Sequence, residues 1–256
     1  MPSSPLFDVD GRIALVTGSS RGIGRALVEG LAAAGAHVIV HARNGAAVAE
    51  VVDRIRAAGG VADAAVFDVT DEADVERGVA GIEGSIGAIE VLVNNAGIQR
   101  RAPFTEFPTK DWEALLATNL TSAFLVGRSV ARGMQERGRG KIVNIASVQS
   151  RLGRPNIAPY AATKGGIAML TRGMCADLAR FGIQVNAIAP GYFETDLTRA
   201  LVDDESFSAW VRQRTPAGRW GDPKELVGAL LFLCSAASDF VNGQIVFVDG
   251  GMTAVV

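Results

Sequence analysis

Residues 12–34 read RIALVTGSSRGIGRALVEGLAAA, and they are the strongest indication of the fold. The apolar run Arg12 to Thr17 is typical of a buried strand, and Arg25 to Ala34 has helical periodicity. The turn between them spaces its glycines as G-x-x-x-G-x-G, which differs from the commoner dinucleotide fingerprint G-x-G-x-x-G. Strand, glycine turn and helix in this order favour a phosphate site at the helix N-terminus. Alternatively, the glycines only form a tight turn that binds no phosphate.

Outward from this stretch, strand-like runs alternate with helical segments. The predicted strands are 12–17, 37–42, 61–68, 89–93, 141–146, 184–189 and 244–248. This alternation indicates an α/β fold with a parallel sheet and right-handed crossovers. The chain contains no internal repeat, charge run or proline-rich linker, so we predict one domain over residues 1–256. Residues 191–216 have weak periodicity and exceed the usual connection length, which suggests a lid.

The second predicted strand ends at His41-Ala42-Arg43-Asn44. In dinucleotide folds an acidic residue at this place binds the ribose 2′-hydroxyl. There is no acid here, and Arg43 is available for a 2′-phosphate, with Arg21 as a second cation. We therefore expect NADP rather than NAD, although Arg43 could be an ordinary solvated loop residue.

Residues after two further strands suggest a site at the carboxyl edge of the sheet. Asn95 can fix the strand ends by donating and accepting hydrogen bonds, while Ala96 and Gly97 allow close approach of a cofactor. Ser147 follows the run 141–146, and ligands of open α/β sheets bind at such strand ends.

Tyr160 and Lys164 lie one helical turn apart, so the ammonium is expected near the phenol. A phenol has a pKa of about 10, and a nearby cation lowers it. With Ser147 as a donor, these side chains suit reversible hydride transfer to a carbonyl. A Tyr-x-x-x-Lys pair alone is usually ordinary surface chemistry.

Composition excludes several classes of protein. With 48% hydrophobic and 20% charged residues, the chain of 256 residues suits a compact fold, and its net charge of −2 argues against nucleic-acid binding. Cys175 and Cys234 lie in apolar stretches far from His37 and His41, so no metal site or disulfide is predicted. Residues 1–10 lack a basic segment followed by an apolar run, and the sequence suggests no apolar stretch of the roughly 20 residues that a spanning helix needs. We therefore expect a cytoplasmic protein without membrane partners.

Together these motifs resemble the short-chain dehydrogenase/reductase family along essentially the whole chain. The resemblance implies a Rossmann-type, doubly wound sheet of about seven strands, a homotetramer, and catalysis by Asn119, Ser147, Tyr160 and Lys164. It implies that Asp68 and Val69 border the adenine, Lys164 holds the nicotinamide ribose, Thr195 bonds the carboxamide, and Asn119 anchors a relay water. The full predicted cofactor set is Gly18, Ser20, Arg21, Gly22, Ile23, Gly24, Arg43, Asp68, Val69, Asn95, Ala96, Gly97, Tyr160, Lys164, Pro190, Gly191 and Thr195.

Within the family, residues 94–101, 103–108, 170–175, 219–223 and 238–243 resemble members that interconvert D-gluconate and 5-keto-D-gluconate. A sugar-acid carboxylate favours guanidinium partners. Four loop arginines are candidates: Arg100, Arg101, Arg151 and Arg154. We predict that Arg101 and Arg154 bind the substrate together with Ser147 and Tyr160, although loop arginines are more often solvated.

Two alternatives remain open. One is a 3-oxoacyl-[acyl-carrier-protein] reductase, or another polyol or ketone reductase of the family, in which Arg128, Arg132 and Arg172 would help to dock the carrier. The other is a non-catalytic NADP-binding sensor. The intact set of Ser147, Tyr160 and Lys164 argues against a sensor, which has no need of it.

Overall fold

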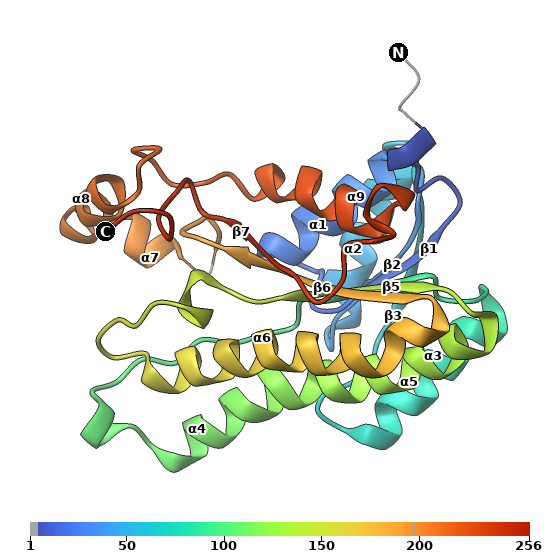
Figure 1. The fold of residues 1–256 in the computed structure, drawn as a ribbon, viewed down its shortest axis with the longest axis horizontal. Coiled ribbons are helices and arrows are strands. Elements are labelled where there is room, and N and C mark those ends of the chain that lie inside the picture. The colour runs from blue at the N-terminus through green and yellow to red at the C-terminus, as the bar shows by residue number, and fades with distance from the viewer. Residues whose placement is uncertain (1–4, 197) are drawn as a thin grey trace.

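The predicted strands pair in one parallel sheet (Figure 1), as seen in a computed structural model that describes residues 5–196 and 198–256. The strand order is β3-β2-β1-β4-β5-β6-β7. Their bounds are β1 Ile13–Val16, β2 His37–His41, β3 Val61–Ala65, β4 Val91–Asn94, β5 Gly140–Ile145, β6 Ile183–Pro190 and β7 Ile245–Val248. The central strands are near-continuous apolar runs because helices cover both faces of the sheet.

The chain runs outward from β1 through β2 to β3 and then returns to pair β4 against the other side of β1. The strand order therefore reverses between β1 and β4, and doubly wound sheets bind ligands at such a switch point. The predicted doubly wound sheet is confirmed.

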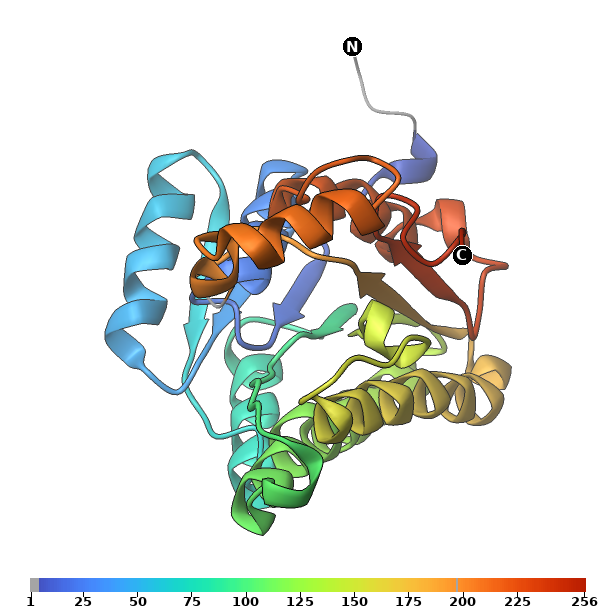
Figure 2. The ribbon, with the colours of Figure 1, turned by 90° about the vertical axis from the view of Figure 1, so that its left-hand side faces the viewer.

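Helices cover the two faces in separate layers (Figure 2). One layer contains α1 (Gly22–Ala33), α2 (Gly45–Ala57) and α9 (Val227–Cys234), and the other contains α3 (Glu72–Ser85), α5 (Ser122–Arg137) and α6 (Ala158–Leu178). Each layer packs on its own apolar cluster, with Leu27 and Leu230 in the first and Ile82 and Met134 in the second. Residues of α1 and α2 in one layer and of α6 in the other line the cleft described below.

The helical run around Asn119 is interrupted. In place of one continuous helix, α4 (Thr109–Leu116) passes through a π-helical turn at Ala117–Thr121 into α5. Such bulges are frequent at functional sites. Asn119 lies in this turn and is buried.

By length and composition alone, the helical run Thr109–Arg137 could cross a membrane, contrary to our reading of the sequence. Half of its apolar window is buried within the fold. The run is therefore weak evidence for a membrane span, because a core helix passes the same test.

The predicted lid region contains two helices, α7 (Arg199–Val202) and α8 (Glu205–Arg214). Asp204 caps α8 by accepting hydrogen bonds from the backbone N–H groups of Ser206 and Phe207. The helices follow the end of β6, so they stand beside the carboxyl edge of the sheet.

Candidate active site

The glycine turn after β1 is held by the loop that follows β4. The Asn95 side-chain amide donates to the carbonyls of Thr17, at 2.9 Å, and Gly18, at 3.0 Å. In return the Thr17 hydroxyl accepts from the backbone N–H groups of Asn95 and Ala96. A Cβ on Gly24 would lie 2.4 Å from the Asn95 amide nitrogen, so this position requires glycine. Two motifs that are remote in sequence thus form one unit.

The N-terminus of α1 fits a phosphate. Arg21 precedes the helix and makes no side-chain capping hydrogen bond, whereas Asn44 caps α2. The first-turn N–H groups of α1 thus have no side-chain acceptor from the capping position, and such groups attract anions. This glycine-lined cradle suits the pyrophosphate of a dinucleotide.

His41 supports the same turn, and sequence reasoning missed this role. Its Nδ1 accepts the Gly18 N–H at 3.2 Å, which leaves the proton on Nε2 to donate to the Phe67 carbonyl at 3.1 Å. Burial lowers the pKa of His41 to about 4, so the ring is neutral at physiological pH. The signal available in the sequence was a histidine inside a buried strand.

Arg43, after β2, and Asp68, after β3, lie close together in the part of the cleft where the resemblance places the adenosine. Arg43 Nη1 lies 3.6 Å from Asp68 Oδ2, and the guanidinium is largely exposed. Burial raises the pKa of Asp68, but hydrogen bonds from Thr70 and the charge of Arg43 outweigh it and hold the pKa below its usual value. An exposed pair of this kind contributes little to stability. Arg43 is therefore free to take a stronger anionic partner.

Ser147, Tyr160 and Lys164 come together at the end of β5. The Ser147 hydroxyl accepts from the Gln149 N–H at 3.1 Å, and the Ser147 side chain lies close enough to the Tyr160 phenol to lower its pKa. Lys164 is buried and donates to the Ile145 carbonyl at 2.7 Å. Its Nζ lies 5.8 Å from the centre of the Tyr160 ring.

The effect that we expected of Lys164 on Tyr160 is not seen. Burial raises the pKa of Tyr160 above its ordinary value, against the opposing effects of the Ser147 hydrogen bond and the Arg101 charge. Burial also lowers the pKa of Lys164 to about 8, and its ammonium is engaged by the Ile145 carbonyl. The correction follows from desolvation, which sequence spacing does not reveal. At neutral pH Tyr160 is a phenol and can donate a proton.

Asn119 is a structural clamp behind the cleft wall. Its side-chain oxygen accepts the Ile98 N–H at 2.7 Å, and its amide donates to the Ile98 carbonyl at 3.0 Å. The amide also contacts the Thr163 hydroxyl at 3.3 Å on the helix that carries Tyr160. Asn119 thus joins the loop after β4 to α6, and its predicted water stays a prediction.

All the predicted cofactor and substrate residues line one cleft of about 810 Å³, and Asn119 alone of the predicted site residues lies outside its lining. Arg101 lies near enough to Tyr160 for its charge to act on the phenol, and Arg154 is close enough for its charge to act on Arg101. The other two candidate arginines are placed elsewhere: Arg100 lies 3.8 Å from Asp111, and Arg151 lies over the Phe247 ring.

The cleft also contains residues that sequence reasoning did not assign to the site. Gln149 and Tyr192 line it, and the charges of Arg101 and Arg154 act on the Tyr192 phenol. Their sequence signals were modest. Gln149 lies two residues after Ser147, and Tyr192 directly follows Gly191 and is one of only two tyrosines in the chain.

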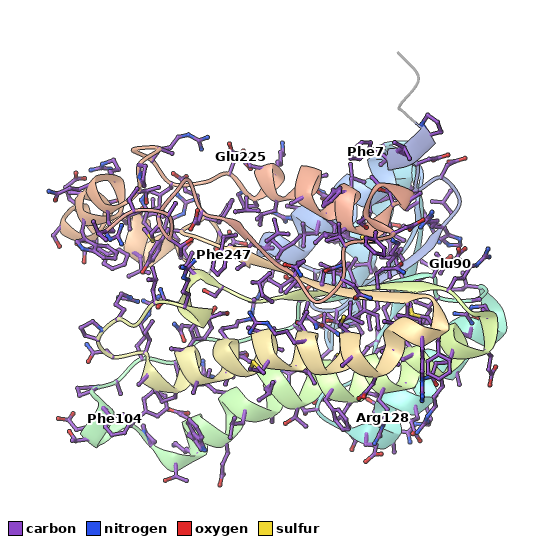
Figure 3. All side chains as sticks on the ribbon, viewed as in Figure 1. Phe7, Glu90, Phe104, Arg128, Glu225 and Phe247 are labelled. Carbon is purple, nitrogen blue, oxygen red and sulfur yellow. The ribbon has the colours of Figure 1, made fainter. Side chains whose placement is uncertain are left out.

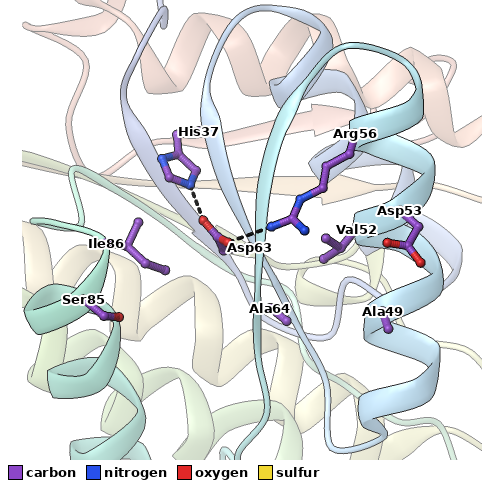
Figure 4. A pocket seen from close by; sticks show the side chains of 9 residues that line it. All are labelled: His37, Ala49, Val52, Asp53, Arg56, Asp63, Ala64, Ser85 and Ile86. Atoms are coloured by element: carbon purple, nitrogen blue, oxygen red, sulfur yellow. Dashed lines mark hydrogen bonds and ion pairs between the residues drawn. The ribbon is translucent and has the colours of Figure 1, made fainter.

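A second hollow of about 720 Å³ lies at the amino ends of the strands, against edge strand β3. Figure 4 shows that three of its polar groups pair with one another: Asp63 accepts from His37 at 2.7 Å and from Arg56 at 2.9 Å. It lies at the edge of the sheet where ligands are not expected. Within residues 5–196 and 198–256, no group of three His, Cys, Asp or Glu side chains could hold a metal ion.

A phosphate cradle at one end of a cleft, and a serine and a tyrosine at the other, define a nicotinamide-dependent oxidoreductase that acts on a CH–OH group. The family model described as Enoyl-(Acyl carrier protein) reductase matches residues 18–253. The chain belongs to the short-chain dehydrogenase/reductase family, so the predicted family is confirmed.

Individual relatives are similar over nearly the whole chain. The chain is 56% identical to gluconate 5-dehydrogenase of Gluconobacter oxydans over 253 residues, covering 99% of both chains. It is 54% identical to 5-keto-D-gluconate 5-reductase of Escherichia coli K12 over 251 residues, covering 98% of this chain and 99% of the other. A crystal structure of a gluconate 5-dehydrogenase from Burkholderia cenocepacia in complex with NADP and tartrate superposes with a TM-score of 0.97 at 59% identity. The match covers 98% of this chain and 99% of the other.

Proposed function

We propose that this protein interconverts D-gluconate and 5-keto-D-gluconate with NADP(H). The observation that carries the proposal is the pair Arg101 and Arg154 beside the reacting groups. Among the described residues, neither guanidinium makes an ion pair with a carboxylate. Two neighbouring cations repel each other unless an anion lies between them, and a carboxylate pairs with guanidinium bidentately. The similarity to proteins named for gluconate supports the same substrate.

In this proposal the chain's own residues position the substrate and move its proton. NADPH, when bound in the glycine cradle, supplies the hydride. Tyr160 donates its phenolic proton to the substrate carbonyl oxygen, and Ser147 holds that oxygen by a hydrogen bond. In the oxidation Tyr160 accepts the same proton back. Lys164 and Thr195 are the proposed contacts of the nicotinamide ribose and carboxamide, and Asp68 and Val69 those of the adenine.

The raised pKa of Tyr160 gives a pH prediction with a definite sign. Oxidation requires the phenolate, whose population rises about tenfold per pH unit below the pKa. The kcat/KM for D-gluconate should therefore climb between about pH 7 and 9 without a plateau. Initial rates of NADP⁺ reduction across this range measure it. A plateau near neutral pH would mean that the phenolate already forms there, as the sequence had suggested.

Arg43 provides a prediction on cofactor choice. Arg43→Ala should lower the preference for NADPH over NADH by about 10-fold or more, because a charge-assisted hydrogen bond contributes about 1.5–3 kcal/mol. The ratio of the two kcat/KM values measures it. Arg54→Ala is the matched control, since Arg54 pairs with Glu29 and does not line the cleft. An unchanged ratio would exclude Arg43 as the reader of the 2′-phosphate.

The carrier-protein alternative has weaker support. Arg128, labelled in Figure 3, pairs with Glu72. Arg132 pairs with Glu76 at 3.0 Å, so two of the three proposed docking cations are neutralised. The assembled Ser147 and Tyr160 likewise argue against a sensor.

The proposed function is tested by NADPH oxidation with 5-keto-D-gluconate beside an acetoacetyl thioester, with NADH as the control cofactor. We expect fast, NADPH-selective turnover of the keto acid. Turnover of the thioester alone would assign the enzyme to the acyl reductases. Turnover of neither would reject the substrate.

We also propose that the enzyme is a cytoplasmic homotetramer with residues 191–216 as a lid, as the resemblance and the chain pattern suggest. Exposed apolar side chains on α4, α5 and α6, Trp112, Phe124 and Met169, offer surface for subunit contacts. Light scattering coupled to size exclusion tests the tetramer.

A further inference from the structure

Three buried polar atoms on the substrate side of the cleft have no hydrogen-bond partner. They are Gln149 Oε1, Arg154 Nε and Tyr192 Oη, half of the six such side-chain atoms among residues 5–196 and 198–256. Leaving a buried polar atom unpaired costs about 1–3 kcal/mol, and native structures contain few. Because these three atoms lie in one part of the cleft, we infer that a bound ligand supplies their hydrogen-bond partners.

Tyr192 packs against three aromatic rings, two of which are on α8. Its ring meets those of Phe207, Trp210 and Trp220 edge-on at centroid distances of 5.7, 5.7 and 5.6 Å. Phe207 also lies under the Arg154 guanidinium at 5.1 Å, so one aromatic cluster positions both groups. The Tyr192 ring is therefore packed on several sides, whereas its hydroxyl has no hydrogen-bond partner.

The chemistry of the two uncharged groups is that of hydroxyl recognition. Burial raises the pKa of Tyr192, so its hydroxyl is protonated and both donates and accepts, as does the Gln149 amide. The Gln149 side chain lies close enough to Tyr192 to lower the pKa of its phenol, but the two groups are not in hydrogen-bonding geometry with each other. Gln149 is also tied through its backbone N–H to the Ser147 hydroxyl. The Tyr192 phenol acts electrostatically on Tyr160, and the charges of Arg154 and Arg101 in turn lower the pKa of Tyr192. Neutral donor–acceptor groups are thus within reach of both the carboxylate end and the reacting end.

We propose that Gln149 and Tyr192 determine specificity by hydrogen-bonding the hydroxyl groups between the substrate's carboxylate and its reacting carbon. The cleft then selects a polyhydroxy keto acid over a keto acid of the same length without hydroxyl groups. A site built for hydroxyl groups discriminates strongly, because the analogue leaves buried groups unpaired. This inference rests on the proposed function.

The test compares two substrates with the same spacing of carboxylate and ketone, 5-keto-D-gluconate and 5-oxohexanoate. The measured quantity is the ratio of their kcat/KM values with NADPH. Tyr192→Phe removes one oxygen atom, and Gln149→Met retains length without hydrogen bonding. Each should lower the ratio by about 10-fold or more, equivalent to about 1.4 kcal/mol.

Trp210→Phe is the matched control, because Trp210 packs on Tyr192 but does not line the cleft. A ratio that stays within twofold of wild type in both Tyr192→Phe and Gln149→Met overturns the inference, as does an equal fall in Trp210→Phe, which would indicate packing alone. A wild-type enzyme that reduces neither keto acid rejects the proposed function and removes the inference with it.

Discussion

Tyr160→Phe should lower kcat by at least about 10²- to 10⁴-fold in both directions, because it removes the only proposed proton donor and acceptor at the reacting oxygen. The ring remains, so the packing around it is preserved. Tyr160 is one member of the predicted cofactor set, but NADPH affinity should stay within about threefold, because the glycine cradle and the other predicted cofactor residues are unchanged. Stopped-flow turnover and a fluorescence titration with NADPH measure the two quantities.

The other tyrosine supplies the comparison. Tyr192→Phe removes the same atom from the same cleft, but its effect should appear in substrate discrimination and remain far smaller in kcat. A Tyr160→Phe variant that retains most of its turnover would exclude Tyr160 as the acid and base. A variant that loses NADPH binding as well would show a structural role instead.

Removing the paired guanidinium groups should have the second-largest effect. Arg101→Ala and Arg154→Ala should each raise the KM for 5-keto-D-gluconate by about 10- to 100-fold, because a hydrogen bond to a charged group contributes about 1.5–3 kcal/mol. Steady-state kinetics with saturating NADPH measure the change. For Arg154 part of the loss reflects its stacking on Phe207.

Neighbouring arginines in the same loops give matched controls. Arg100→Ala and Arg151→Ala remove the same charge at positions that do not line the cleft, so KM should stay within about twofold. If all four variants raise KM alike, general electrostatic attraction rather than a carboxylate site explains the effect. If Arg101→Ala leaves KM unchanged, Arg101 does not bind the carboxylate.

Much of the fold follows from local pattern. Strand β1, the glycine turn and α1 were predictable because apolar periodicity and glycine spacing are encoded in adjacent residues. The π turn at Ala117–Thr121 was not, because it depends on the fit of Asn119 between Ile98 and Thr163, which are remote in sequence. Strand β3 is likewise shorter than the predicted 61–68. It ends at Ala65, and the Phe67 carbonyl beyond it accepts a hydrogen bond from His41, which is remote in sequence.

The candidate site was predictable in its membership and less so in its energetics. Motifs indicated Ser147, Tyr160 and Lys164, but the pKa shifts of Tyr160 and Lys164 depend on burial by the whole fold, which reversed the expected effect on Tyr160. Gln149 and Tyr192 carry no motif. Their importance appears only when the structure shows their polar atoms buried and unpaired.

Isotope transfer tests the central claim most directly. NADPH deuterated at both C4 positions is incubated with 5-keto-D-gluconate, and the sugar acid formed is analysed by mass spectrometry and NMR. The expected product is D-gluconate with one deuterium on C5. A sugar acid without deuterium, or with deuterium at another carbon, would contradict it.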